Sequence, residues 1–202
     1  FEERQRLARD LHDAVSQTLF SAGIIAEMLL RLQKHDPETI QSGLEQLLLL
    51  TKGAQAEMRT LLLELRPTAL LETNLEDLLI QLNVAFTGRV GIPVILNFDI
   101  DTDDAFPPDV KITLYRIAQE SLNNITKHAD ASEVTISLQR EHKQVRLSII
   151  DNGGGFDLAN TSQDRLGMKI LRERAQSIGA DLTIISAPGD GTEIVVVWPN
   201  PA

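Results

Sequence analysis

Leu7-Ala8-Arg9-Asp10-Leu11-His12-Asp13-Ala14-Val15-Ser16-Gln17, near the start of the chain, is the stretch around which the sequence is organised. Apolar or small residues recur through it and beyond it in steps of three and four: Leu7, Leu11, Ala14, Thr18, Ala22, Ile25, Leu29 and Leu32. This spacing places them along one side of a helix. We therefore predict a long amphipathic helix from about residue 2 to about residue 34.

His12 follows Leu11 and lies between Asp10 and Asp13, so we expect it at the edge of the apolar stripe, facing water. Asp13 and Gln17 are one helical turn apart and share a face. A histidine in such a carboxylate-rich, partly exposed setting suits a nucleophile or a proton carrier. On an isolated helix the simpler interpretation is a solvated histidine, and residues far downstream decide between the two.

A second long helix follows. Asp36-Pro37-Glu38 combines an N-cap acid, a proline at the first helical position and an acid in the first turn. A heptad seam then runs through Ile40, Leu44, Leu47, Thr51, Ala54, Met58, Leu61 and Leu65, before Arg66-Pro67 ends the helix. Two helices cannot cover both stripes, so we predict a homodimer that forms a four-helix bundle. The alternative, a hairpin packed on its own C-terminal domain, leaves more apolar surface exposed.

Composition narrows the class of function. The chain has 202 residues, 43% of them hydrophobic, with 29 acidic and 19 basic residues and a net charge of −10. Without a dense basic patch, direct binding to nucleic acid or to a membrane surface is not expected. The absence of cysteine excludes disulfides and thiol catalysis. No apolar run approaches the ~18 residues that span a bilayer. The chain opens at Phe1 within a charged helical pattern, so we expect an upstream portion to be missing.

After Pro67 the heptad pattern gives way to a mixture of helices and strands. The predicted elements are helices near residues 75–86, 108–125 and 168–178, and strands near 94–100, 134–138, 145–150, 182–185 and 192–198. Hairpins in this order indicate an α+β layer, with one mainly antiparallel sheet and helices on one face. The boundary between the two parts is predicted near residues 65–73.

Four polar residues share one side of the helix that opens at Pro107-Pro108. Glu120 and Asn124 are one turn apart, and Lys127 and His128 follow one turn later. A carboxylate and an amide oxygen at this spacing can share a hard cation or its waters, and a nearby lysine can neutralise a phosphate. Taken alone, such a stripe is more often the wet face of a helix.

Glycine-containing stretches follow at three places. Asp151-Asn152-Gly153-Gly154-Gly155 comes directly after a predicted strand, where glycines admit a ligand close to the backbone and the acid can accept a hydrogen bond from an exocyclic amine. Leu166-Gly167-Met168 precedes a helix, whose free N–H groups suit a phosphate. Gly189-Asp190-Gly191-Thr192 opens the last strand. Each alone is explained as a turn, but together, in fixed order, they favour a nucleotide site.

This combination resembles the ATP-binding domain of sensor histidine kinases, whose Bergerat (GHKL) α/β-sandwich fold is shared with gyrase, Hsp90 and MutL. The stretch from Glu120 to Ala129 is similar to the family's N box, and Asp151 to Gly155 is similar to its Asp-x-Gly-x-Gly box. Gly167-Met168 and Gly191-Thr192 are similar to its later glycine motifs. The resemblance implies ATP and Mg²⁺ as cofactors.

The opening stretch resembles the phosphoacceptor helix of the subfamily whose partners are response regulators with a LuxR-type (LuxR/NarL) helix-turn-helix output. Leu11-His12-Asp13 followed by Gln17 carries this similarity. The resemblance implies a dimerising phosphotransfer hairpin at residues 1–66, a hinge at 67–73 and an ATP-binding domain at 74–202.

The resemblance also implies a role for each matched position. His12 would accept the γ-phosphoryl group of ATP, Asp13 would orient the ring or assist proton removal, and Gln17 with Asp13 would position a water that dephosphorylates the regulator. The implied nucleotide contacts are Mg²⁺ at Asn124 supported by Glu120, phosphates at Lys127, His128, Gly167 and Met168, the adenine amine at Asp151, and pocket shape or base contacts from Gly153, Gly155, Gly191 and Thr192.

One position departs from the family pattern. The glycine motif after the lid usually reads Gly-x-Gly, but Arg165 occupies its first position. The segment before it, residues 157–164, is short and polar, as expected of a mobile lid. We expect nucleotide binding to be retained, with Arg165 as a candidate phosphate contact.

The function implied by the resemblance is the cytoplasmic catalytic core of a two-component sensor histidine kinase. It would autophosphorylate on His12, transfer the phosphoryl group to an aspartate of a response regulator, and also act as the regulator's phosphatase. One alternative is an ATPase of the same fold that does not phosphorylate itself, which His12 and the absence of a transducer domain argue against. Another is a dimerising scaffold with a degenerate nucleotide site, although Asn124, Asp151, Gly153 and Gly155 are all in place.

Overall fold

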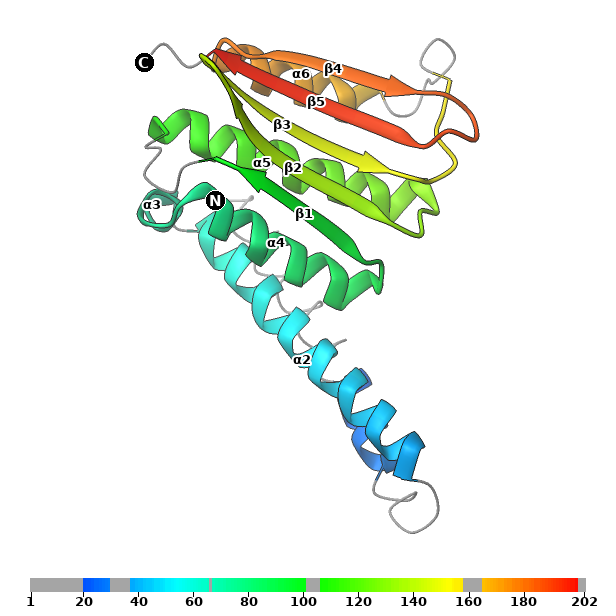
Figure 1. The fold of residues 1–202 in the computed structure, drawn as a ribbon. Coiled ribbons are helices and arrows are strands. Elements are labelled where there is room, and N and C mark those ends of the chain that lie inside the picture. The colour runs from blue at the N-terminus through cyan, green and yellow to red at the C-terminus, as the bar shows by residue number, and fades with distance from the viewer. Residues whose placement is uncertain (1–19, 30–36, 66, 101–105, 158–164, 200–202) are drawn as a thin grey trace. The chain divides into compact units, whose positions relative to one another are not determined.

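The computed structural model describes residues 20–29, 37–65, 67–100, 106–157 and 165–199 (Figure 1). The chain divides into a helical unit, residues 1–69 with 81–91, and an α/β unit, residues 70–80 with 92–202. The opening stretch, with His12, Asp13 and Gln17, lies outside the described residues, so its predicted helix and roles stay predictions. Within the described part of the chain, no helix is long and apolar enough to cross a membrane.

The described part of the helical hairpin consists of two helical segments. Residues 20–29 are helical, and α2 (Pro37–Leu65) begins and ends at the predicted signals. The two helices approach closely where α2 carries glycine, because a Cβ at Gly43 would collide with the side chain of Leu29. Gly53 lies equally close to the backbone of Gly88 in α4 (Leu75–Val90). Small residues thus set the helix spacing within this unit.

The hairpin keeps a large apolar surface exposed. The predicted seam of the first helix is partly or fully buried at Ala22, Ile25 and Leu29. A second stripe, spaced by four residues and not predicted, lies on its other side. Among the described residues of the hairpin, the large apolar side chains that are exposed are Phe20, Ile24, Met28, Leu44, Leu48 and Met58. Leu44 and Met58 belong to the predicted heptad seam of α2, so that seam is open in the single chain.

The α/β unit is built on a five-stranded sheet with the order β1-β2-β3-β5-β4. The strands are β1 (Val94–Asp99), β2 (Val134–Glu141), β3 (Gln144–Asp151), β4 (Asp181–Ser186) and β5 (Thr192–Pro199). β1 and β2 are parallel, and each remaining neighbouring pair is antiparallel. The prediction of a mainly antiparallel sheet is therefore confirmed.

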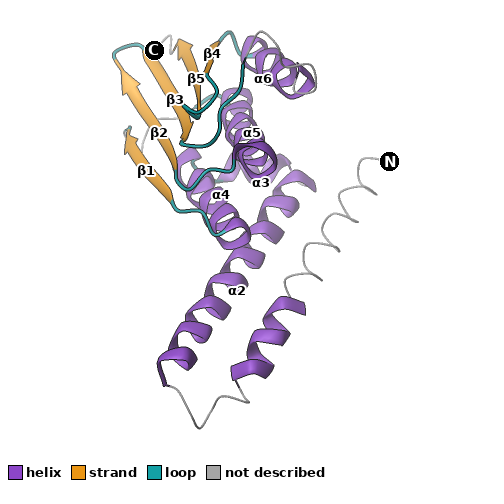
Figure 2. Ribbon diagram, turned by 90° about the vertical axis from the view of Figure 1, so that its right-hand side faces the viewer, coloured by secondary structure: helices purple, strands orange, loops and turns teal. Residues whose placement is uncertain are grey.

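Helices α5 (Pro108–Asn124) and α6 (Arg165–Ser177) cover one face of this sheet (Figure 2). Alternating strand residues point into the layer between sheet and helices, where β2 and β3 bury a continuous apolar surface. The buried apolar strand residues on this face are Val134, Ile136, Leu138, Val145, Leu147, Ile149, Ile194, Val196 and Trp198. The predicted inner face of α5 is buried as expected at Val110, Leu114, Ile117, Ser121 and Ile125.

The stretch predicted as a hinge contains a short helix, α3 (Pro67–Glu72). Within the α/β unit, the Lys111 ammonium of α5 donates hydrogen bonds to the carbonyl oxygens of Leu71 at 2.7 Å and Thr73 at 2.8 Å. Asn74 then caps α4, because its side-chain oxygen accepts from the Asp77 N–H at 2.8 Å. Residues 71–74 are thus held by hydrogen bonds, and the hinge at 67–73 stays a prediction.

The end of α5 differs from the regular helix that the sequence predicts. The α-helix stops at Asn124, and a π-helical turn, η1 (Ile125–Ala129), continues it. Asp130 ends the turn with a left-handed backbone at φ 50°. Such wide turns are often found at functional sites, and this one carries Lys127 and His128 of the predicted polar stripe.

Candidate functional site

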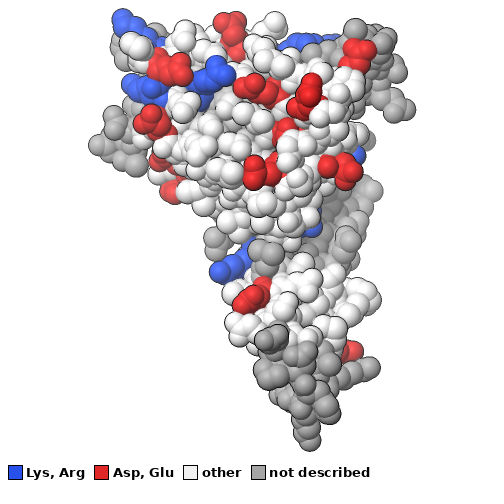
Figure 3. Space-filling view, turned by 45° about the vertical axis from the view of Figure 1, so that its right-hand side comes forward, with Lys and Arg blue, Asp and Glu red and all other residues white. Residues whose placement is uncertain are grey.

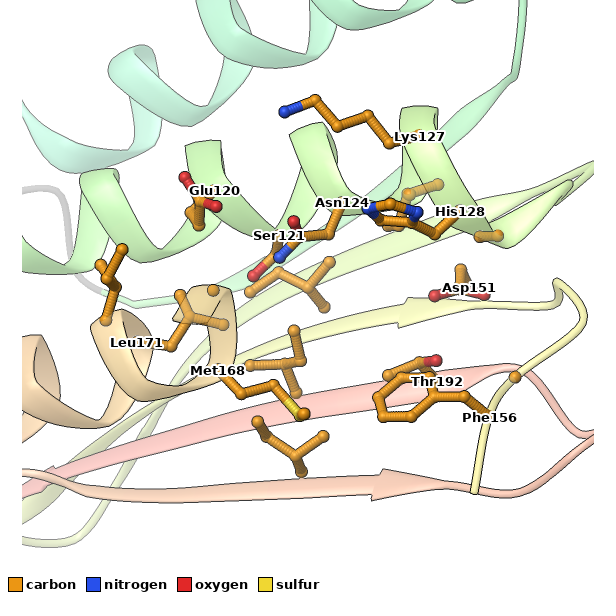
Figure 4. Close-up of a pocket in the computed structure, with 18 residues that line it drawn as sticks. Glu120, Ser121, Asn124, Lys127, His128, Asp151, Phe156, Met168, Leu171 and Thr192 are labelled. Carbon is orange, nitrogen blue, oxygen red and sulfur yellow. The ribbon is translucent and has the colours of Figure 1, made fainter. Parts of the chain in front are cut away.

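A cavity of about 280 Å³ lies within the α/β unit, between α5 with η1, the ends of β3 and β5, and the start of α6 (Figure 4). Its polar lining consists of Glu120, Ser121, Asn124, Lys127, His128, Asp151 and Thr192. Its apolar walls are Ile125, Ala129, Ile149, Phe156, Met168, Ile170, Leu171, Ile184 and Ile194, and Gly155 and Gly167 complete it. Polar groups therefore gather at two ends of a mainly apolar space.

The first polar end comes from α5 and η1. Glu120 and Asn124 reach the same point, because a Cβ at Gly167 would lie 3.8 Å from Glu120 Oε1 and 3.7 Å from Asn124 Nδ2. Lys127 and His128 are exposed on η1, and Figure 4 shows the Lys127 side chain running back over Asn124, away from Asp151. All four predicted residues of the stripe thus line the cavity. A glycine at the start of α6 leaves open the space between them and the helix.

Asp151 forms the second polar end, at the last position of β3. Its side chain is only 5% exposed, and its Oδ1 accepts a hydrogen bond from the Gly153 N–H at 2.9 Å. Burial raises the pKa of the Asp151 carboxyl above its ordinary value, while hydrogen bonds from the backbone N–H groups of Gly153 and Thr192 act in the opposite direction. A buried carboxylate with unfilled acceptor capacity facing a cavity suits a ligand that donates hydrogen bonds.

Two of the three glycines after Asp151, Gly153 and Gly155, are required by close backbone contacts. A Cβ at Gly153 would collide with the carbonyl oxygen of Ala129 in η1, and the next residue, Gly154, donates its N–H to that same oxygen at 2.7 Å. Gly155 has φ +55°, and a Cβ there would meet the Ala187 carbonyl oxygen. The loop is therefore pressed between η1 and the turn that precedes β5.

The same turn approaches the end of β3 from the other side. Gly191 has φ +73°, and a Cβ there would collide with the carbonyl oxygen of Asp151. Gly153 and Gly191 are thus absent from the lining and instead shape the backbone behind it. The side chain of Arg165, predicted to contact phosphates, lies outside what the structure describes, and only its place at the start of α6 is given.

Sequence reasoning missed two features of the site. Asn152 ties the glycine loop to the start of β2, since its Oδ1 accepts from the N–H groups of Ser132 at 2.9 Å and Glu133 at 3.0 Å. The apolar walls were also missed, except for Met168, because no other motif marks them. Strand alternation carries a signal for two of them, as Ile149 and Ile194 lie two positions from Asp151 and Thr192 on the same face.

The side-chain oxygens of Glu120 and Asn124 suit a cation that also binds a phosphate of a ligand. No cluster of three or more His, Cys, Asp or Glu side chains able to hold a metal occurs among the described residues. Mg²⁺, however, usually takes one or two protein oxygens and completes its shell with waters and substrate phosphates. Glu120 Oε1 and Asn124 Oδ1, each 3.8 Å from the position of a Cβ at Gly167, are side-chain oxygens of the kind that requirement calls for, and the glycine leaves room beside them.

Charge on the surface agrees with the composition. Figure 3 shows acidic side chains scattered over the face in view and separated by uncharged ones. One ion pair on the outer face of the sheet joins Arg146 to Glu193 at 3.5 Å.

Two family models match the chain. The first, described as "Histidine kinase", matches residues 3–70, and the second, described as "Histidine kinase-, DNA gyrase B-, and HSP90-like ATPase", matches residues 109–202. The two matches fall on the helical hairpin and on the α/β unit that contains the cavity. Their order along the chain is the one expected from the motifs.

Curated relatives align along nearly the whole chain. Sensor histidine kinase LiaS of Bacillus subtilis (strain 168) is 40% identical over 198 residues, which are 98% of this chain and 54% of LiaS. Sensor protein VraS of Staphylococcus haemolyticus (strain JCSC1435) is 36% identical over 197 residues, 98% of this chain and 55% of VraS. The chain thus spans about half the length of the curated relatives it matches.

Solved structures share the fold at low identity. The blue-light activated histidine kinase of Erythrobacter litoralis EL346 superimposes with a TM-score of 0.54 at 18% identity, covering 96% of this chain and 63% of that one. The histidine kinase AdeS of Acinetobacter baumannii gives a TM-score of 0.52 at 16% identity, covering 91% and 98%. The predicted fold class, a helical N-terminal region followed by an α/β sheet ATPase domain, is thereby confirmed.

Proposed function

This chain belongs to the sensor histidine kinases of two-component systems, and from that premise we propose that it autophosphorylates on His12 with ATP and Mg²⁺. The observation that carries the proposal is the cavity, where the matched residues of α5 and η1 face Asp151 and Thr192 across apolar walls. An adenine ring would lie at the Asp151 end, where an exocyclic amine can donate to the carboxylate. The phosphates would then extend toward Asn124 and the start of α6.

The phosphate end would be held by charge and by backbone donors. Asn124 and Glu120 would bind Mg²⁺ or its waters, and Lys127 with His128 would contact phosphate oxygens. The first turn of α6 supplies unpaired N–H groups beside Gly167, where an anion is favoured. We place Arg165 there as a further phosphate contact, since it is the first residue of that helix.

Phosphoryl transfer depends mainly on positioning and charge neutralisation. A neutral imidazole nitrogen of His12 would attack the γ-phosphorus, the bond to the ADP oxygen would break, and Lys127 would offset the charge on that oxygen. Mg²⁺, held by Asn124 and Glu120, would supply further positive charge to the phosphates. Asp13 would orient the ring and assist removal of its proton. Because the nucleophile must be neutral, autophosphorylation should fall as the pH drops through the pKa of a histidine.

The phosphoryl group would then pass to an aspartate of a response regulator with LuxR-type output. Asp13 and Gln17 would position a water for the reverse, phosphatase reaction. We also propose that the exposed stripes of the hairpin pair with a second copy of the chain in a four-helix bundle. The exposed Phe20, Leu44 and Met58 support this, because a hairpin that functioned alone would leave them in water.

The test is incubation of the chain with Mg²⁺ and γ-labelled ATP, followed by acid and alkali treatment of the labelled protein. We expect acid-labile, alkali-stable label that is lost in His12→Gln and in Asn124→Ala. His142→Asn is the matched control, because His142 lies in the exposed β2–β3 turn with a positive φ that asparagine tolerates.

Three outcomes separate the competing interpretations. Label that survives in His12→Gln would move the acceptor to another residue. Release of free phosphate without labelled protein would favour an ATPase of the same fold. Nucleotide binding without label or phosphate release, in a chain shown to be dimeric, would favour a scaffold.

A further inference from the structure

Ser186, at the end of β4, is the meeting point of three segments around the base end of the cavity. Its Oγ accepts a hydrogen bond from the Phe156 N–H of the glycine loop at 2.9 Å. It also lies 2.9 Å from the carbonyl oxygen of Gly191 and 3.0 Å from Oγ1 of Thr192. Ser186 does not line the cavity, whereas Phe156 and Thr192 do.

The direction of these hydrogen bonds follows from counting protons. A serine hydroxyl has one proton to donate and two lone pairs that accept. The Gly191 carbonyl oxygen can only accept, so the single proton of Ser186 goes to it. The Phe156 N–H fills one lone pair, and the Thr192 hydroxyl must then donate to the other. The one proton and both lone pairs of the Ser186 hydroxyl are then engaged in hydrogen bonds.

The arrangement decides what Thr192 offers to a ligand. Its only hydroxyl proton points to Ser186, so the remaining lone pairs of Oγ1 act as acceptors. Figure 4 shows this hydroxyl and the Asp151 carboxylate at the same end of the cavity. The backbone N–H of Thr192, a donor, is itself directed at the Asp151 carboxylate. The Asp151 carboxylate and the Thr192 hydroxyl therefore both present acceptors to a ligand at this end (Figure 4).

We propose that Ser186 is a positioning residue that fixes the Thr192 hydroxyl as an acceptor, so that the cavity selects a base with an exocyclic amine over one with a carbonyl there. An amine has two protons, one for Asp151 and one for Thr192 or a water between them. A carbonyl at the same place would face two acceptors without a proton to share, which is unfavourable in a buried site. This inference rests on the proposed nucleotide function of the cavity.

A purely structural role for Ser186 predicts a different result. Its hydrogen bonds to Phe156 and Gly191 also hold the loop in place, so on this explanation removal of the hydroxyl lowers the affinity for every ligand by the same factor. Only a change in preference between bases identifies control of the Thr192 proton. The readout must therefore be a ratio of affinities rather than one affinity.

The experiment measures Kd by titration calorimetry for ATP and for ITP. The hypoxanthine of ITP carries a carbonyl where adenine carries the amine, and an N1–H donor where adenine N1 is an acceptor. The wild-type chain should bind ATP more tightly. In Ser186→Ala, Thr192 is free to turn its proton to the ligand, so the ITP/ATP ratio of Kd values should fall about two- to tenfold, the range of one neutral hydrogen bond. Ser186→Thr, which keeps a hydroxyl, should retain the ratio, as should Ser137→Ala on the half-buried outer face of β2.

A double-mutant cycle with Thr192→Val locates the effect. By itself, Thr192→Val should lower the ITP/ATP ratio of Kd values. Adding Ser186→Ala to Thr192→Val should not change the ratio further. The Thr192→Val variant also tests the inference if Ser186→Ala does not fold. An unchanged ITP/ATP ratio of Kd values in Thr192→Val would overturn the inference. Equal losses of ATP and ITP affinity in Ser186→Ala would also overturn it, since they indicate bracing only. A wild-type chain that binds neither nucleotide would overturn the proposed function as well.

Discussion

Asp151 and Thr192 lie directly opposite each other in the antiparallel register of β3 and β5, and the Thr192 backbone N–H acts to lower the pKa of the Asp151 carboxyl. The pair stands where both strands meet glycine-containing turns, so neither turn can shift without moving the carboxylate. Gly191 packs against the backbone carbonyl of Asp151, and the Gly153 N–H donates a hydrogen bond to Oδ1 of the Asp151 side chain. The carboxylate is thus fixed in place before any ligand binds.

Nucleotide affinity should be lost on acidification earlier than an ordinary aspartate would allow. Burial raises the pKa of Asp151 above its ordinary value, and only the ionised form offers acceptors on both oxygens. The Kd for ATP should therefore rise as the pH falls through this raised pKa. Because Glu120, Lys127 and His128 also line the cavity, Asp151→Asn is measured in parallel. Its affinity should be low throughout and lack this step, and an identical step in both proteins would assign the titration elsewhere.

The same pKa shift has a consequence for folding stability. A carboxyl whose folded-state pKa lies above its unfolded value binds its proton more tightly in the native state. Its contribution to the free energy of unfolding therefore declines as the pH rises from the unfolded pKa through the folded one. At neutral pH, Asp151→Asn should keep or raise Tm in thermal denaturation of the ligand-free chain. A Tm several degrees below wild type would show that the carboxylate is needed for the fold.

Gly153→Ala should destabilise the α/β unit, while Gly154→Ala should not. A methyl group at Gly153 would collide with the Ala129 carbonyl oxygen, whereas at Gly154 the nearest atom, that same oxygen, is 3.8 Å away. Overpacking against a fixed backbone costs about 1–3 kcal/mol. Urea denaturation of the two variants gives the comparison, and equal stabilities would mean that the loop yields without cost.

Lys111→Met should loosen the segment before α4. The ammonium group donates to the carbonyl oxygens of Leu71 and Thr73, and methionine keeps the apolar stem but removes both of these hydrogen bonds. We expect a loss of about 1–3 kcal/mol in urea denaturation, together with faster amide exchange at the start of α4. Lys143→Met, in the exposed β2–β3 turn, is the control and should be neutral. If Lys111→Met matches it, the two hydrogen bonds contribute nothing net.

The helices and strands could be predicted from the sequence where a hydrophobic periodicity or a helix-breaking residue was present. The start of α2 at Pro37 and the alternating strands β1 to β5 follow from local rules, and the motifs identified most polar residues of the cavity. The π-turn of η1 has no such signal, because it depends on packing against the loop at Gly153. Ser186 was equally invisible, since a serine at a strand end says nothing of the proton directions that tertiary contacts impose.

Dimerisation should depend on the exposed stripe of the hairpin. Phe20 is 71% exposed and Leu44 is 53% exposed, and burying them against a second copy would remove apolar surface from water. Leu44→Glu should therefore shift the sedimentation equilibrium toward monomer, with Kd raised at least tenfold for about 1.4 kcal/mol lost per chain pair. Ile95→Glu is the matched control, because Ile95 is 45% exposed on β1 and lies outside the hairpin. A monomeric wild-type chain, or equal effects of both variants, would mean that the stripe is covered by something other than a second copy.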